Sequence, residues 1–219
     1  MELGDVIRTT ATTRYYTDEP VSDEVLYRVL ELARFAPSGG NRQGWKVVVV
    51  RDAQLRRAVR DLYIGPWNAY AGRARSGQLA PKSTRVLSAA EEFAQQLHEV
   101  PVHLVVCAQL AALAITDADL ERPSIVGGAS IYPFVQNLLL ACREQGLGAA
   151  LTTLLCVEEP KAKELLGIPD SYGIATLIAV GHPDPRRPRQ LTRQPVESFA
   201  FCERFDGPPL GVSSSQREG

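Results

Sequence analysis

Residues 32–50 read LARFAPSGGNRQGWKVVVV, and the order of signals in this stretch is the most informative in the chain. Pro37 stops the helix that precedes it, because proline lacks the N–H that a helix interior needs. Gly39 and Gly40 let the backbone turn tightly, and the apolar run Lys46–Val50 is typical of a fully buried strand. The turn carries four hydrogen-bonding side chains, Ser38, Asn41, Arg42 and Gln43. We therefore expect a helix, a turn suited to a flat polar ligand, and a strand.

Outside this stretch, the apolar spacing predicts further helices and strands around one core. Ser22 can cap the helix that stops at Pro37, and Asp52 can cap the helix that follows the first strand. The longest apolar-periodic segment, residues 125–145, is expected to be a central helix that ends at Gly146. Other helices are expected over residues 89–99 and 158–166, and other strands over residues 102–108, 149–155 and 173–181.

Residues 64–85 interrupt this pattern with scattered glycines and prolines, which predict a long loop or a poorly regular helix. The segment also contains Trp67 and Tyr70 among several basic residues. Long irregular segments in compact domains often bind ligands, so we interpret Trp67 and Tyr70 as part of a lid over a substrate. A passive loop is the alternative.

Length and composition predict one domain over residues 1–219, because 219 residues with 45% hydrophobic content can bury one full core. The last part, residues 182–219, is rich in proline, arginine and serine and is expected to be an extended arm, flexible past Gly207. A formal net charge of -1 argues against nucleic-acid binding. The apolar runs are too short to span a membrane, and with no signal peptide we expect a cytoplasmic protein.

The cysteines and histidines do not predict a metal site or a catalytic thiol. The four cysteines are far apart in sequence and form no CxxC pair: Cys107, Cys142, Cys156 and Cys202. Free cysteines in apolar runs usually behave as small buried hydrophobes, and a redox or metal role is the alternative. His103 lies inside an expected strand and is interpreted as a core residue rather than a ligand.

Three motifs, in this order and spacing, resemble those of the FMN-dependent nitroreductase family. The first is TTRYY at residues 12–16, followed by Pro20-Val21, and the second is the turn at residues 36–45. The third is IYPFVQNLLLA at residues 131–141, which continues through GLG at 146–148 to LLGIP at 165–169. The resemblance spans residues 8–195 and implies an α+β fold with a mixed, mainly antiparallel sheet flanked by helices and an extended C-terminal arm.

The resemblance also implies an activity and a set of partners. It implies a homodimer with two FMN sites at the subunit interface, and NAD(P)H as the reductant. The electron acceptor would be a small molecule such as a nitroaromatic, a quinone or another electron-poor compound. Because the flavin carries the chemistry, no catalytic acid or base need be visible in the sequence.

The family pattern assigns cofactor contacts residue by residue. Arg14 matches the cation beside N1 and O2 of the flavin, where reduction adds negative charge. The backbone N–H of Leu154 matches the donor to flavin N5, and Arg193 matches an arginine that holds the phosphate. The remaining contacts implied are Thr12, Pro37, Ser38, Gly39, Asn41 and Thr153. The chain departs from the pattern at Thr10 and Ala11, where family members commonly carry one or two basic residues, and at Gly44, where proline is usual.

Other functions remain open at this point. A dehydrogenase, a reductive dehalogenase and a flavin-fragmenting enzyme share the fold of the family. A non-catalytic protein that binds or sequesters flavin is the alternative from another class, and the missing cations at Thr10 and Ala11 favour it.

Overall fold

The computed structural model describes residues 1–78, 84–185 and 191–211. Two compact units, residues 1–189 and 190–219, are described here separately. In the described part of the second unit, Phe201 and Pro209 form an antiparallel bridge, and Val196–Ser198 form a 3-10 turn, η6. The single domain expected over residues 1–219 stays a prediction.

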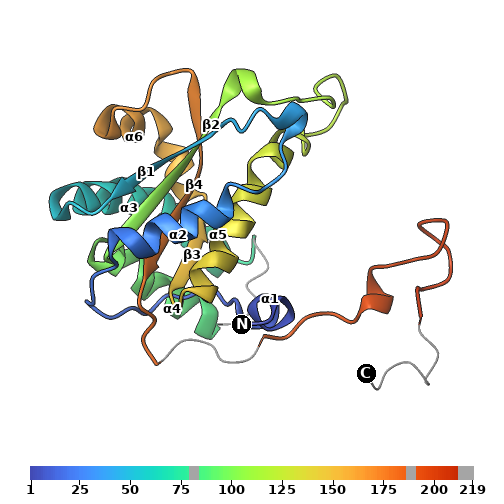
Figure 1. Cartoon of the computed structure of the whole chain (residues 1–219), viewed down its shortest axis with the longest axis horizontal. Helices are drawn as coiled ribbons and strands as arrows, with labels where there is room; N and C mark the ends of the chain where they lie inside the picture. Colours follow the sequence, from blue (N-terminus) through green and yellow to red (C-terminus); the bar gives the residue numbers. More distant parts are fainter. Residues whose placement is uncertain (79–83, 186–190, 212–219) are drawn as a thin grey trace. The chain divides into compact units, whose positions relative to one another are not determined.

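Four strands form one sheet in the first unit, in the spatial order β1-β2-β4-β3 (Figure 1). The strands are β1 (Trp45–Val50), β2 (Val102–Gln109), β3 (Gly148–Thr152) and β4 (Tyr172–Gly181). Every strand pair is antiparallel, and the parallel pairing found among the described residues is a single bridge between Thr12 and Ala149. The α+β fold class expected from the sequence is confirmed, although β3 ends at Thr152 and not at residue 155.

The strand order explains why β1 differs from its prediction. β1 lies at the edge of the sheet, and the side chains of Lys46 and Val49 are exposed, so the expectation of a fully buried strand is wrong here. The central strand β2 is buried over Val102–Ala108. A run of valines predicts a strand but does not say whether another strand lies beyond it.

Helices cover both faces of the sheet, and the alternation of side chains along β2 divides the core in two. Leu104 and Val106 pack into one apolar cluster with α2 (Asp23–Ala33) and α5 (Tyr132–Glu144). Val105 and Cys107 point to the other face and pack into a second cluster. That cluster includes residues of α3 (Ala53–Arg75), α4 (Thr84–Gln96) and α6 (Glu159–Leu166). The short helix α1 (Leu3–Thr9) packs near α5.

The predicted capping residues hold the helix ends. The Ser22 side chain accepts a hydrogen bond from the Val25 N–H at the start of α2. Asp52 accepts from the backbone N–H groups of Gln54 and Leu55 at the start of α3. The interpretation of His103 as a core residue is also confirmed: it is fully buried, with Nε2 2.7 Å from the Leu97 carbonyl oxygen.

Helix α3 corrects the expectation of an irregular segment over residues 64–85. It continues without a break to Arg75 and contains Pro66 in its interior. Five side chains at helical spacing face the core: Val59, Tyr63, Trp67, Ala71 and Ala74. Burial of this stripe outweighs the propensity penalties of the glycines and the proline. The rest of the expected irregular segment falls partly on residues 79–83, which lie outside the described residues.

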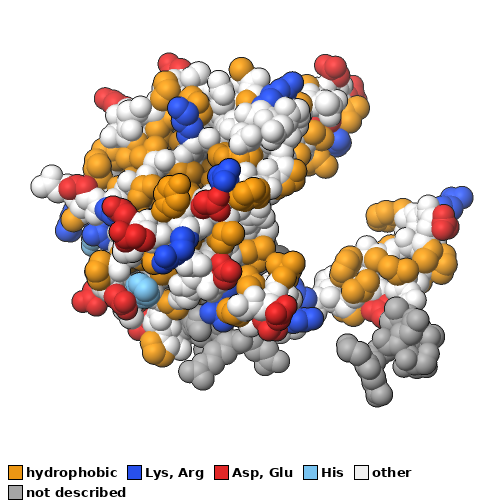
Figure 2. Space-filling view, in the orientation of Figure 1, with side chains coloured by type: hydrophobic (Ala, Val, Ile, Leu, Met, Phe, Trp, Pro, Cys, Tyr) orange, Lys and Arg blue, Asp and Glu red, His pale blue; other side chains and the backbone are white. Residues whose placement is uncertain are grey.

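Positive and negative side chains are interspersed on the face of the first unit seen in Figure 2, without a broad basic area. Within the described ranges, no helix combines the length and the apolar character needed to cross a membrane.

Candidate functional site

The segment that carries Arg14 is fixed against the sheet. The Thr13 N–H donates to the Ala149 carbonyl at 2.9 Å, and Thr13 is 3% exposed. Gly148 makes this approach possible, because a Cβ at that position would meet Thr13 side-chain atoms at 2.6 Å. The Tyr16 hydroxyl donates to the carbonyl oxygens of Thr13 at 2.6 Å and Ala179 at 3.1 Å. Arg14 therefore extends from a backbone that is anchored on both sides.

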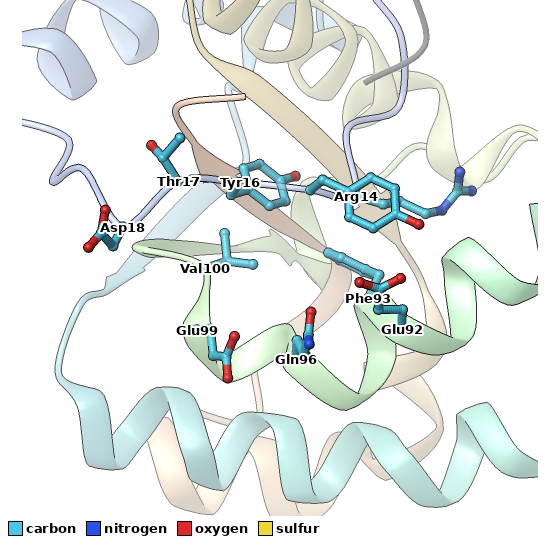
Figure 3. Close-up of a pocket in the computed structure, with 10 residues that line it drawn as sticks. Arg14, Tyr16, Thr17, Asp18, Glu92, Phe93, Gln96, Glu99 and Val100 are labelled. Carbon is cyan, nitrogen blue, oxygen red and sulfur yellow. The ribbon is translucent and has the colours of Figure 1, made fainter. Parts of the chain in front are cut away.

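The Arg14 guanidinium group has no hydrogen bond or ion pair with any residue in the part of the chain that the structure describes. Its side chain extends away from the carboxylates of Asp18 and Glu99 (Figure 3). Its positive charge nevertheless acts on two tyrosines, since it opposes the rise that burial causes in the pKa values of Tyr16 and Tyr63. A partly buried, unpaired cation is suited to an anionic or electron-rich ligand.

Tyr63, Thr152 and Leu154 form a hydrogen-bonded group close to this cation. The Tyr63 hydroxyl lies 3.2 Å from Thr152 Oγ1, at the end of β3. The Leu154 N–H, at the start of the 3-10 turn η5 (Leu154–Glu158), donates to the same Oγ1 at 3.4 Å. We call Arg14, Tyr63, Thr152 and Leu154 the Arg14 cluster. It contains two residues that the family resemblance assigned to different parts of a flavin ring, Arg14 to N1 and O2 and Leu154 to N5.

A cavity of about 360 Å³ adjoins Arg14, between residues 14–18 and the residues of α4 and the turn that follows it (Figure 3). Three carboxylates line it: Asp18, Glu92 and Glu99. Carboxylates repel a phosphate group, so the chemistry of this cavity does not suit the phosphate end of a nucleotide. The Arg14 cluster, and not the interior of this cavity, is the better candidate for the cofactor ring.

The predicted ligand-binding turn, residues 37–44, is held in an unusual conformation that we call the Ser38 turn. Asn41 and Gln43 have positive φ values of 53° and 48°, a region that L-residues seldom adopt. The Ser38 Oγ accepts a hydrogen bond from the Gln43 N–H at 3.0 Å. The Gln43 side-chain amide donates to Asn41 Oδ1 at 3.1 Å. Backbone strain of this kind is typical of a functional site.

The Ser38 turn packs against residues 109–130. The Gly39 N–H donates to Ser130 Oγ at 3.0 Å, and the Gln109 N–H donates to the Gly44 carbonyl at 2.7 Å. A Cβ at Gly44 would lie 2.6 Å from the Cβ of Ala112, so glycine at this position is required by packing. The residue that departs from the family pattern is therefore explained by its neighbour.

Asp117 organises the loop next to the Ser38 turn. Its carboxylate accepts hydrogen bonds from the Ser124 hydroxyl at 2.7 Å, the Arg122 guanidinium at 2.8 Å and the Ile125 N–H at 3.0 Å. The Ser124 bond, followed by the Ile125 bond, lowers the pKa of Asp117 to about 2. The loop is therefore held by a charge that persists across the physiological pH range.

The Arg14 cluster and the Ser38 turn lie apart within one chain. The Ser38 turn, at the end of α2, lies beside the loop formed by residues 110–127, whereas residues 10–18 run along the other end of the sheet (Figure 1). Pro37, Gly39 and Asn41 are exposed, and Ser38 is half-buried. Within the described residues, the two halves of the predicted cofactor site do not meet in one chain.

Trp67 and Tyr70 lie one turn apart on α3 in different surroundings. Trp67 is 4% exposed and packs in the core, while Tyr70 is 39% exposed. Their ring centroids are 5.8 Å apart. The lid role of both residues stays a prediction, and the burial of Trp67 favours a packing role for that side chain.

The other predicted contacts differ in their surroundings. Thr12 is exposed two residues before Arg14, and Thr153 is exposed directly before η5. Arg193 is exposed in the second unit, where its guanidinium donates to the Thr192 carbonyl at 2.9 Å. Positions 10 and 11 lack the basic residues of the family pattern. The residue before them, Thr9, accepts a hydrogen bond at its Oγ1 from Arg143 of α5, at 2.9 Å.

Sequence reasoning did not identify Tyr63 or Ser130, and it placed Thr152 in the stretch beside the flavin without giving it a contact of its own. Tyr63 looks like any aromatic residue in a core stripe, and its hydrogen bond to Thr152 joins positions 89 residues apart. Ser130 lies 91 residues from Gly39, and a lone serine before a helix is no signal for such a contact.

Comparisons with known proteins fit this geometry. The family model described as "Nitroreductase family" matches residues 7–182, so the chain belongs to the nitroreductase family. It is 30% identical to an NADH dehydrogenase of Thermus thermophilus, over 78% of this chain and 81% of that protein. It is 22% identical to a nitrobenzene nitroreductase of Ectopseudomonas oleovorans, over 90% of this chain and 95% of that protein.

A solved structure confirms the fold. The crystal structure of oxidised iodotyrosine deiodinase, bound to FMN and 3-iodo-L-tyrosine, matches with a TM-score of 0.71 and 22% identity. The match covers 89% of this chain and 96% of the deiodinase chain. The relatives thus share a fold and differ in the reaction that their names describe.

Proposed function

We propose that this member of the nitroreductase family is an FMN-dependent oxidoreductase that passes electrons from NAD(P)H to a nitroaromatic, a quinone or another electron-poor small molecule. The Arg14 cluster is the observation that carries the proposal. It sets an unpaired guanidinium near a backbone N–H that is only weakly bonded, at 3.4 Å, inside one anchored group. A cation at the pyrimidine end of a flavin ring and a hydrogen-bond donor at N5 both tune the electronic properties of the flavin.

The residues present fit the ring of FMN. FMN, when bound, supplies the chemistry by accepting a hydride at N5 and passing electrons on to the acceptor. Arg14 would hold the pyrimidine edge and stabilise the negative charge that reduction adds there. The Leu154 N–H would donate to N5, with Thr12 and Thr153 beside the ring. None of these residues has to transfer a proton as an acid or a base.

We further propose that the site is completed by a second copy of the chain. The Ser38 turn is exposed and strained, yet its own chain holds it in place through Ser130. Apolar side chains before it, Leu32 and Phe35, are 43% and 68% exposed. A homodimer would cover these side chains and bring Pro37, Ser38, Gly39 and Asn41 to the cofactor bound by its partner.

The phosphate end of FMN is expected to contact Arg193 on the arm, which would reach it as the arm wraps the dimer. Thr10 and Ala11 offer no charge there. Tyr70 and, less directly, Trp67 would shape the acceptor site. We expect a cytoplasmic protein, where both the reductant and the reduced cysteines would be maintained.

The proposal is tested with the purified protein. FMN, and not FAD, should be released by heating and identified by chromatography. Under nitrogen, NADH or NADPH should bleach the bound flavin, and a nitroaromatic or a quinone should restore its colour. Finding FAD, or no flavin after reconstitution with excess FMN, would overturn the proposal.

The alternative is a protein that binds flavin without turnover, and a specific observation favours it. The first motif has no basic residue at Thr10 or Ala11, where family members commonly carry one or two, and carboxylates line the neighbouring cavity. Such a protein would be yellow, but NADH and NADPH would bleach it only slowly. The rate of bleaching therefore separates the two functions.

A further inference from the structure

We propose that Tyr63 is a positioning residue of the flavin site, whose phenol fixes the Thr152 hydroxyl as a hydrogen-bond donor beside the Leu154 N–H. This inference rests on the proposed function and deepens it, since it assigns to helix α3 a role in the electronic properties of the cofactor. Three groups share hydrogen bonds here: the Tyr63 phenol, the Thr152 hydroxyl and the Leu154 N–H.

The Leu154 N–H can only donate, so in the free chain it occupies one lone pair of Thr152 Oγ1, and it would leave this weak bond of 3.4 Å for flavin N5 when FMN binds. A hydroxyl has two acceptor lone pairs and one hydrogen of its own. The direction of the hydroxyl therefore depends on what the second partner, Tyr63, does at its distance of 3.2 Å.

Tyr63 must be the donor in that contact. It is 3% exposed, and its hydroxyl has no acceptor other than Thr152 Oγ1 among the residues that the structure describes. If Thr152 donated instead, the phenol hydrogen would be buried without a partner, which is costly. Burial also raises the pKa of Tyr63 above its ordinary value, so the phenol keeps this hydrogen at neutral pH.

Because the Tyr63 hydroxyl engages one lone pair of Thr152 Oγ1 whether or not FMN is bound, the hydrogen of Thr152 must point away from Tyr63. The backbone that carries it is also fixed, because Thr176 Oγ1 donates to the Thr152 carbonyl at 2.9 Å. Thr152 is half-buried, which leaves part of the residue open to a ligand beside the cluster. Tyr63 thus turns a freely rotating hydroxyl into a directed donor.

A directed donor at the flavin ring stabilises the reduced form more than the oxidised form, because the reduced ring carries more negative charge. Without the Tyr63 hydroxyl, the Thr152 hydroxyl can rotate into the vacated direction and donates to the ring for only part of the time. We therefore expect Tyr63→Phe to lower the reduction potential of the bound flavin while the aromatic ring still fills the core.

The experiment measures the midpoint potential and the FMN dissociation constant of five purified proteins: wild type, Tyr63→Phe, Thr152→Val, the double variant and Tyr27→Phe. Tyr27 is 73% exposed and serves as the matched control for loss of a phenol. Thr152→Val should weaken binding of the reduced flavin about tenfold relative to the oxidised flavin, which is about 30 mV for a two-electron couple. Tyr63→Phe should show a smaller shift in the same direction, and Tyr27→Phe none.

The double variant decides whether Tyr63 acts through Thr152. If it does, the double variant matches Thr152→Val alone, because the phenol has no hydroxyl left to orient. Additive shifts, or an unchanged potential in FMN-loaded Tyr63→Phe, would overturn the inference and leave the proposed function standing. Failure of the wild type to bind FMN would overturn the proposed function and the inference together.

A further variant guards against loss of folding in Tyr63→Phe. Thr152→Ser keeps the hydroxyl and should keep a potential close to that of the wild type, whereas Thr152→Val should not. Equal potentials in these two variants would show that the Thr152 hydroxyl does not act on the flavin. That result alone would overturn the proposal.

Discussion

The Arg14 cluster and the Ser38 turn show two different ways of preparing a site. The Arg14 cluster is built on the core: Tyr63 is buried in α3, and Thr152 ends a strand of the sheet. The Ser38 turn is exposed and adopts strained backbone angles, which its own hydrogen bonds and Ser130 maintain. The Arg14 cluster, which we call the packed half, derives its rigidity from packing. The Ser38 turn, which we call the exposed half, derives its rigidity from polar contacts.

Mutations in the two halves should therefore have different effects on folding and on ligand binding. Changes in the packed half should affect folding and function together, unless they remove only a charge or a hydroxyl. Changes in the exposed half should affect ligand binding and leave the fold nearly intact, because little apolar surface is buried there.

Trp67→Ala is expected to have the largest effect. Removing a buried aromatic side chain typically costs about 3–5 kcal/mol of the free energy of unfolding. Tyr70→Ala should cost much less, since Tyr70 is 39% exposed, and should change kcat/KM for the acceptor instead. Urea denaturation and steady-state kinetics separate the two. If Trp67→Ala altered the choice of acceptor at unchanged stability, Trp67 would act as part of a lid and not as part of the hydrophobic core.

Acid should lower the free energy of unfolding through the buried His103, by about 3 kcal/mol. Burial, the main cause, lowers the pKa of His103 to about 4 from its ordinary value of 6.5. The folded state therefore keeps the ring neutral, while the unfolded chain binds a proton. The stabilisation is complete above about pH 6.5 and is lost as the pH falls toward 4.

Urea denaturation between pH 4 and 7 checks this dependence. His103→Gln retains a donor for the Leu97 carbonyl and should have a flatter pH profile than the wild type. His98, whose pKa burial also lowers, is the control, and His98→Gln should retain most of the slope. Identical slopes in the wild type and His103→Gln would assign the acid sensitivity to other groups.

The sequence predicted helix starts and a tight turn, which depend on residues that are neighbours along the chain. Ser22 and Asp52 cap helices as expected, because a side-chain oxygen at a helix start has neighbouring N–H groups to accept from. The tight turn predicted at Gly39 and Gly40 is present as well, and Gly40 has a φ of 61°, a conformation that glycine adopts readily.

Features that depend on distant partners were not predictable. The irregular segment expected from Gly65, Pro66 and Gly72 is helical as far as Arg75, because a buried stripe outweighs local penalties. The exposure of β1 follows from the strand order, which no residue of β1 encodes. In the Arg14 cluster, the family resemblance proposes Arg14 and Leu154 as cofactor contacts, which stays a prediction, and nothing near them in sequence points to Tyr63.

Arg14→Ala tests whether the positive charge of the Arg14 cluster stabilises the reduced flavin, and it leaves the buried side chains of the cluster in place. Losing a charge-assisted hydrogen bond of about 1.5–3 kcal/mol should weaken binding of the reduced flavin by one to two powers of ten and lower its potential. Thermal stability should change little, because the guanidinium has no partner to lose within the described residues. Arg8→Ala removes an exposed arginine close by and serves as the control. An unchanged potential in folded, FMN-loaded Arg14→Ala would remove Arg14 from the site.

Ser130→Ala tests the exposed half and should have the smallest effect. It removes the acceptor for the Gly39 N–H, a bond worth about 0.5–1.5 kcal/mol, from a turn that water can reach. Because the turn is strained, we expect part of this loss to appear as looser FMN binding, by about threefold to tenfold, with an unchanged thermal midpoint. Ser88→Ala, at an exposed serine of α4, is the control. If Ser130→Ala instead lowered stability and left FMN affinity unchanged, the Ser38 turn would be part of the fold and not of the site, and the contrast between the two halves would fail.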